Sequence, residues 1–102
     1  MRLNNDCIRD ILLTIEAVSD GYKQFFISLD DFDEGLPDKF ELLSSYTEPE
    51  LTYHVKQCNE AGLLSGVVLP ADGGFAFCDL TPKGHWSVSY THLRAHETEL
   101  HL

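Results

Sequence analysis

The sequence is poor in basic residues and has no long hydrophobic run. Lysine and arginine number 7 against 17 aspartates and glutamates, which gives a formal net charge of −10. Nucleic-acid binding takes much of its affinity from basic groups that neutralise phosphates, so this balance counts against a DNA-binding face. No stretch of about eighteen apolar residues occurs, so we expect no membrane span. The N-terminal MRLNNDC is charged and amide-rich, so we expect no signal peptide and a cytoplasmic protein.

Cysteines are few and isolated, and motifs for catalysis are missing. Cys7, Cys58 and Cys78 form no C-x-x-C pair and have no histidine at zinc-finger spacing. We therefore expect buried or half-buried thiols in a reducing compartment, with no metal site and no cofactor. A nucleophile elbow, a phosphate-binding loop and a Gly-rich dinucleotide turn are all absent, so we expect no enzyme and no catalytic residue. His54 and His85 are interpreted as packed or surface residues.

The length suits one small domain, and its first element is predicted to be a helix. Asn4 or Asn5 is in position to cap this helix, and Gly21 marks where the chain leaves it. Apolar residues recur at the three- and four-residue spacing of a buried helical face, namely Ile8, Ile11, Leu12, Ile15 and Val18.

A strand and an acidic segment follow the first helix. Residues 23–29, KQFFISL, are rich in apolar, aromatic and β-branched side chains and predict a strand. The acidic residues Asp30, Asp31, Asp33 and Glu34 do not have the spacing of a calcium-binding loop, in which ligands alternate and a glycine occupies the sixth position. We therefore expect a solvated loop there, and then a short helix from Pro37 through Leu43.

The strongest local signature begins at Thr47. The segment Thr47-Glu48-Pro49-Glu50 combines a capping threonine, a glutamate three residues later and a proline in the first turn. Leu51, Val55 and Cys58 then predict the buried stripe of a helix that Gly62 ends. The opposite face of this helix is predicted to carry Thr52, Tyr53, Lys56, Gln57 and Glu60.

A hairpin and a last helix complete the pattern. Residues 64–69 and 75–80 predict two strands around the turn-forming segment 70–74, with Phe75 and Phe77 on one face. Thr81 and Pro82 predict the cap and first position of another helix. The order predicts an α+β, winged helix-turn-helix-like fold: three helices, a small antiparallel sheet with a β-hairpin wing, and a truncated C-terminal helix.

Three sequence blocks cover most of residues 1–85: MRLNNDCIRDILLTIE, YTEPELTYHVKQCNEAGLL and DLTPKGH. On these blocks the sequence resembles the bacterial and phage family called "domain of unknown function 2513". The resemblance implies a winged-helix-like domain and brings no agreed activity with it. The family's pattern continues with a helix after His85, whereas this sequence departs from it at Ser87.

The C-terminal segment is predicted to have a different origin. Residues 88–98, VSYTHLRAHET, match all eleven residues of a translation of the transposase-adapter DNA used in sequencing-library preparation. We therefore predict a winged-helix-like domain over residues 1–87 and a non-native, adapter-derived tail over 88–102 that packs poorly or projects. The metal-like spacing of His92, His96 and His101 is accordingly assigned no site. Without the tail, six basic and fifteen acidic residues leave a net charge of −9.

Two functions remain open, and the first is a DNA-binding transcriptional regulator. The scaffold is most often used in this way, with the capped helix as recognition element. Its residues for contacting double-stranded DNA would be Thr52, Tyr53, Lys56 and Gln57, with His54 flanking them.

The alternative is an acidic protein-protein interaction module on the same scaffold, which does not bind DNA. The hairpin residues 64–80 include Asp72 and Asp79 but no lysine or arginine, so a wing that grips phosphates is missing. Apolar wing residues such as Phe75 and Phe77 are the candidates for docking the protein partner, although we expect at least one of them to pack under the wing instead. The sequence makes no prediction of the oligomeric state.

Overall fold

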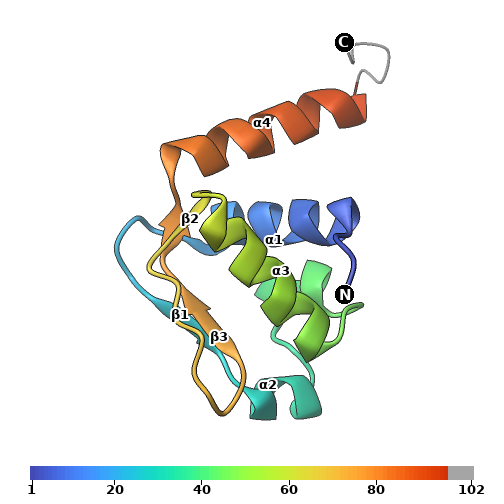
Figure 1. Cartoon of the computed structure of the whole chain (residues 1–102), viewed down its shortest axis with the longest axis vertical. Helices are drawn as coiled ribbons and strands as arrows, with labels where there is room; N and C mark the ends of the chain where they lie inside the picture. The colour runs from blue at the N-terminus through green and yellow to red at the C-terminus, as the bar shows by residue number, and fades with distance from the viewer. Residues whose placement is uncertain (97–102) are drawn as a thin grey trace.

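The short strands lie together on one side of the molecule, and α1 and α3 pack beside them (Figure 1). The computed structural model describes residues 1–96 and the side chains of residues 1–89. In chain order the elements are α1 (Asn5–Val18), β1 (Phe25–Ile27), α2 (Leu29–Glu34), the 3-10 helix η1 (Asp38–Leu43), α3 (Glu48–Glu60), β2 (Leu64–Ser65), β3 (Phe75–Phe77), β4 (Asp79–Leu80) and α4 (Pro82–His96). The predicted α+β class is confirmed. Within residues 1–96, no helix has the length and apolar character needed to cross a membrane.

The predicted hairpin is present, and its return strand also pairs with β1. β2 pairs antiparallel with β4, and an isolated bridge joins Val68 to Ala76 in the same register. β1 pairs antiparallel with β3, with Phe26 opposite Ala76. Ala76 therefore has a neighbour on each side. The regular strands are shorter than the predicted ranges 23–29, 64–69 and 75–80.

The core lies between α1, α3 and the inner face of these strands. The predicted stripes are confirmed: Ile11, Leu12 and Ile15 of α1 are buried, and Ile8 and Val18 pack partly against the core. On α3 the buried side chains include the three expected apolar ones, which are Leu51, Val55 and Cys58.

The acidic segment after β1 is a helix, so the expected solvated loop was wrong. The Ser28 hydroxyl accepts a hydrogen bond from the Asp31 backbone N–H, and the Asp31 carboxylate accepts one from the Ser28 N–H at 2.8 Å. This reciprocal cap satisfies two donors at the helix start, where negative side chains also meet the positive end of the helix dipole. No residue of α2 is buried, so its carboxylates still face water.

The helix caps that the sequence predicted, at Asn4, Thr47 and Thr81, are confirmed. Asn4 Oδ1 accepts from the Asp6 and Cys7 N–H groups, and Thr81 Oγ1 accepts from the Gly84 N–H at 3.0 Å. Thr47 and Glu50 form the expected reciprocal cap of α3. These helices begin where the sequence places them because each signal lies within four residues of the helix start.

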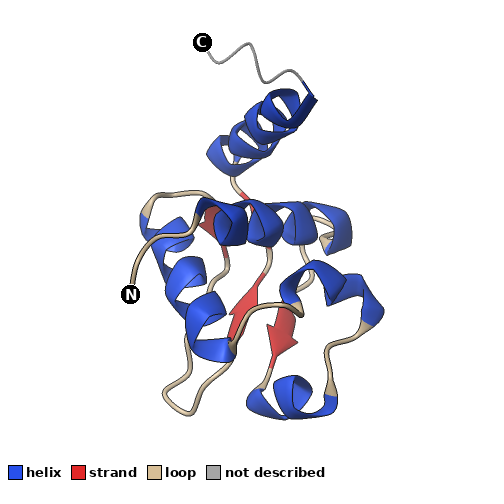
Figure 2. Ribbon diagram, turned by 90° about the vertical axis from the view of Figure 1, so that its right-hand side faces the viewer, coloured by secondary structure: helices blue, strands red, loops and turns tan. Residues whose placement is uncertain are grey.

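α4 lies above α1, and its far end points away from the rest of the domain (Figure 2). Its first turn is fastened to the end of α3, because Thr81 Oγ1 donates to the Gly62 carbonyl at 2.6 Å and Lys83 Nζ donates to the Ala61 carbonyl at 3.0 Å. Val88, the first residue of the predicted tail, is buried in the core. The predicted packing of the side chains after residue 89, including the tail histidines, lies outside the described residues.

Candidate interaction surfaces

The start of α3 is fixed to the hairpin turn by Glu48. One carboxylate oxygen of Glu48 accepts hydrogen bonds from the Thr52 hydroxyl at 2.9 Å and from the Gly74 backbone N–H at 3.0 Å. Thr52, one of the predicted contact residues, is therefore half-buried and already engaged within the fold. No local sequence signal indicates the Glu48 bridge, because its second partner lies 26 residues away.

Tyr53, Lys56 and Gln57 lie next to one another on α3, as the helical spacing requires. Lys56 is exposed, while Tyr53 and Gln57 are partly exposed. Among the residues that the structure describes, the side chains of Lys56 and Gln57 make no hydrogen bond or ion pair. This group is the part of the predicted DNA-contact set that is available to a partner.

His54 is buried, so the interpretation of it as a packed residue is confirmed, whereas the expectation that it flanks the outward face was wrong. Its side chain is 1% exposed, and the Tyr53 ring lies edge-on to it with 5.0 Å between ring centroids. The Asn4 backbone N–H donates to Nε2 at 2.9 Å, so the proton of the neutral ring is on Nδ1, which donates to the Glu50 carbonyl at 2.7 Å. Both ring nitrogens are therefore engaged in hydrogen bonds within the fold, one to the segment before α1 and one within α3.

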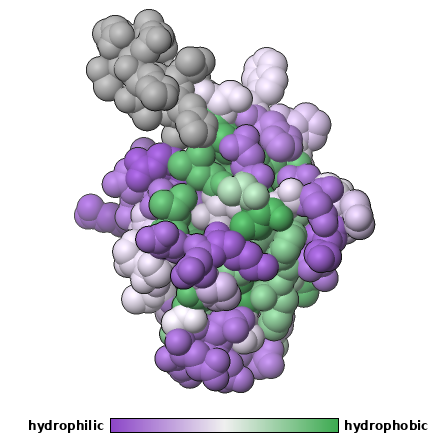
Figure 3. Space-filling view, turned by 180° about the vertical axis from the view of Figure 1, so that it is seen from behind, coloured by the Kyte–Doolittle hydropathy of each residue, from purple (hydrophilic) through white to green (hydrophobic). Residues whose placement is uncertain are grey.

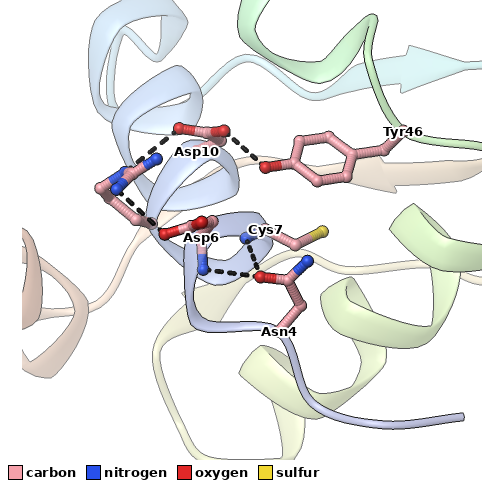
Figure 4. A network of polar contacts seen from close by, with 6 residues as sticks. Asn4, Asp6, Cys7, Asp10 and Tyr46 are labelled. Carbon is pink, nitrogen blue, oxygen red and sulfur yellow. Dashed lines mark hydrogen bonds and ion pairs between the residues drawn. The ribbon is translucent and has the colours of Figure 1, made fainter.

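A second polar network holds the start of α1 to the segment before α3 (Figure 4). Arg9 lies between two carboxylates, with Nη1 3.2 Å from Asp6 and Nε 3.3 Å from Asp10. The Tyr46 hydroxyl donates to the second oxygen of Asp10 at 2.7 Å. Burial, together with the adjacent Asp10 carboxylate, raises the pKa of Tyr46 above its ordinary value. Arg9 is thus neutralised within the fold.

Two further cations are also engaged. Lys83 donates to the carbonyl at the end of α3, where a positive charge meets the negative end of the helix dipole. Lys39 Nζ lies 5.1 Å from the ring centroid of Phe25 and 5.3 Å from that of Phe40, within cation–π range. Between residues 44 and 82, Lys56 is the only lysine or arginine.

Both hairpin phenylalanines are core residues, so the expectation that at least one of them packs under the wing is confirmed, and neither Phe75 nor Phe77 is available to dock a partner. Phe77 is fully buried and stacks on Phe25, with 5.7 Å between ring centroids. Phe75 is buried beside it. The exposed apolar side chains of the sheet are Phe26 and Val68, on the opposite face. The alternation in Phe25-Phe26-Ile27 is the signal that could have identified this outer face.

The cysteines have the character expected of packed thiols. Burial is the main reason that the pKa of Cys7 rises to about 12 and that of Cys58 to about 11. The negative charges of Glu50 and Asp10 raise the Cys7 pKa further. Both thiols are therefore protonated at neutral pH and poorly suited to nucleophilic attack. Within the described residues, no cluster of three potential ligands is placed to hold a metal ion.

Comparison with known proteins places the chain in one family. No curated protein and no solved structure matches it. A family model described as "Hypothetical protein (DUF2513)" matches residues 2–89, which include every described strand and every helix through the first half of α4. The resemblance inferred from the three sequence blocks is confirmed, and the chain belongs to the DUF2513 family.

Proposed function

We propose that this chain is a winged-helix-like domain that binds a protein partner and does not bind DNA. The winged-helix assignment is supported by the element order and by the pairing of β1 with the return strand of the 64–80 hairpin. In such a domain α3 corresponds to the recognition helix and the hairpin to the wing.

The charge of α3 and the hairpin favours a protein partner over DNA. These elements hold a single free cation, Lys56, against five carboxylates, which are Glu48, Glu50, Glu60, Asp72 and Asp79. A DNA-binding face gains affinity by releasing counterions from several phosphates, and one lysine among five carboxylates supplies almost none of that gain. The acidity instead favours a cationic partner surface.

A DNA-binding regulator is the competing function, supported by the adjacent Tyr53, Lys56 and Gln57 on α3. Lysine and glutamine at these positions match the usual contacts to phosphate or guanine and to adenine. Thr52 is a weaker member of the set, because its hydroxyl is bound to Glu48.

A salt series with mixed-sequence duplex DNA tests the choice. Binding of the full chain to a fluorescent duplex is measured by anisotropy between about 50 and 200 mM salt. We expect no binding at the lowest salt. Binding that weakens steeply with salt and is lost in Lys56→Ala, but not in the matched exposed variant Lys23→Ala, would overturn the proposal in favour of the regulator.

A further inference from the structure

The outer face of the sheet keeps apolar side chains in contact with water. Phe26 is 53% exposed and Val68 is 48% exposed. Both pair with Ala76, one from each side, so they flank it in one row across the sheet. The view from behind also has hydrophobic residues at the surface, bordered by hydrophilic ones (Figure 3). The described residues provide no helix that covers Phe26 and Val68.

A hollow of about 260 Å³ adjoins this row, between the end of β1 and the hairpin turn. Its lining consists of Phe26, Ser28, Leu29, Asp30, Asp72 and Gly73. Gly73 and Leu29 approach closely in this lining, because a Cβ at position 73 would be 2.7 Å from the Leu29 side chain. Small-molecule pockets are usually about 300–1,000 Å³ and mostly enclosed, so this open hollow is better sized for one or two side chains of a partner.

The rim of the hollow is negatively charged and unneutralised. Asp30 and Asp72 line it, and Asp33 and Glu34 follow on α2. None of these four carboxylates forms an ion pair within the described part of the chain, where Asp6 and Asp10 pair with Arg9 and Asp79 lies 3.9 Å from His85. Apolar side chains beside unmatched negative charge are complementary to a segment that is both apolar and cationic.

We propose that the outer sheet face and its hollow bind a cationic amphipathic segment of a partner protein. An apolar side chain of the segment enters the hollow against Phe26 and Leu29, and its lysine or arginine side chains lie near Asp30 and Asp72. A second copy of this chain fits poorly, because a two-fold interface would bring the same carboxylates of both copies together. This inference rests on the proposed function, since it specifies where and by what chemistry a protein is bound.

The experiment measures binding of the full chain to short synthetic peptides by fluorescence anisotropy. The probe alternates leucine with arginine, and two control peptides replace either every leucine by serine or every arginine by glutamate. We expect the probe to bind at least about tenfold more tightly than either control, which corresponds to about 1.4 kcal/mol. Equal binding of the serine control would reduce the effect to general charge attraction and overturn the proposal.

Matched variants locate the binding site. Phe26→Ser and the double variant Asp30→Asn/Asp72→Asn should each weaken probe binding about tenfold or more. Their controls are Leu42→Ser, which removes a 47% exposed leucine from η1, and Glu16→Gln/Glu41→Gln, which removes the same charge elsewhere. The controls should change binding less than about twofold. Equal losses in variants and controls would overturn the assignment, and circular dichroism checks that each variant folds.

The outcomes separate this inference from the function on which it rests. If the chain binds neither the probe nor duplex DNA, the proposed surface is wrong while the absence of DNA binding stands. If the chain binds duplex DNA with a steep salt dependence, the proposed function itself fails. Probe binding that depends on Phe26, Asp30 and Asp72 supports both.

Discussion

Replacing His54 by leucine tests whether the buried histidine holds the N-terminus to α3. Leucine fills most of the same space but cannot accept the Asn4 N–H bond or donate to the Glu50 carbonyl. Asn4 is exposed and this bond is only partly buried, so water can reach the freed N–H, and a bond of this kind contributes about 0.5–1.5 kcal/mol net. Loss of the second bond, to the Glu50 carbonyl, adds little. Within α3 this carbonyl is also in position to accept the helical hydrogen bond from the backbone N–H four residues later, which the substitution leaves in place. We therefore expect a loss of about 0.5–1.5 kcal/mol in the free energy of unfolding.

Urea unfolding followed by circular dichroism measures this loss as a shift in midpoint at an unchanged slope. A domain of this size has a total stability of about 5–15 kcal/mol, so the shift is well within reach of the assay. Lys56→Leu, on the exposed face of the same helix, serves as the control and should change stability by less than about 0.5 kcal/mol. A His54→Leu midpoint equal to that of the original chain would refute the reasoning.

Three further predictions concern the same scaffold. Tyr46→Phe removes the 2.7 Å bond to Asp10 and should lower the free energy of unfolding by about 1 kcal/mol in the urea assay; an unchanged midpoint would contradict this. With folded-state pKa values of about 12 and 11, Cys7 and Cys58 should resist a thiol reagent at neutral pH. Because those values exceed the ordinary 9.0, the contribution of the two protonated thiols to the free energy of unfolding is complete below pH 9.0. It should decline as the pH rises towards 12, and a flat alkaline stability profile would contradict this. Gly74→Ala should cost more than about 1 kcal/mol by thermal unfolding, since φ is +78° and the added Cβ would meet the Ile27 carbonyl; an unchanged midpoint would show that the turn can shift.

The features that could be predicted from the sequence are the ones encoded within a few residues. The caps at Asn4, Thr47 and Thr81 are local hydrogen-bonding patterns, and the buried stripes of α1 and α3 follow from helical spacing. The Ser28–Asp31 cap is equally local, but its serine lay inside the range assigned to a strand. The strand ends two residues earlier than the longest apolar segment suggests, which leaves Ser28 free to begin a helix.

The features that escaped prediction depend on contacts between distant segments. All three residues of β3 are buried, so its sequence does not reveal which sheet face the helices cover. Because the helices cover the face that carries Phe75 and Phe77, these two residues lie in the core, and Phe26 on the other face is exposed. By its spacing, His54 likewise lies on the flank of a helix. Its ring has two hydrogen-bond partners only because the distant Asn4 lies against it in the folded chain.

The hydrogen bond between Asn4 and His54 also has a consequence for the order of the folding steps. Its two ends are 50 residues apart, and closing a loop of that length costs about 3.5 kcal/mol of chain entropy beyond a constant term. The Asn4 side-chain cap, in contrast, spans at most three residues and needs no distant partner. α1 can therefore begin to form as a local helix, whereas the attachment of its first turn to α3 is a late event that depends on the two helices having already met.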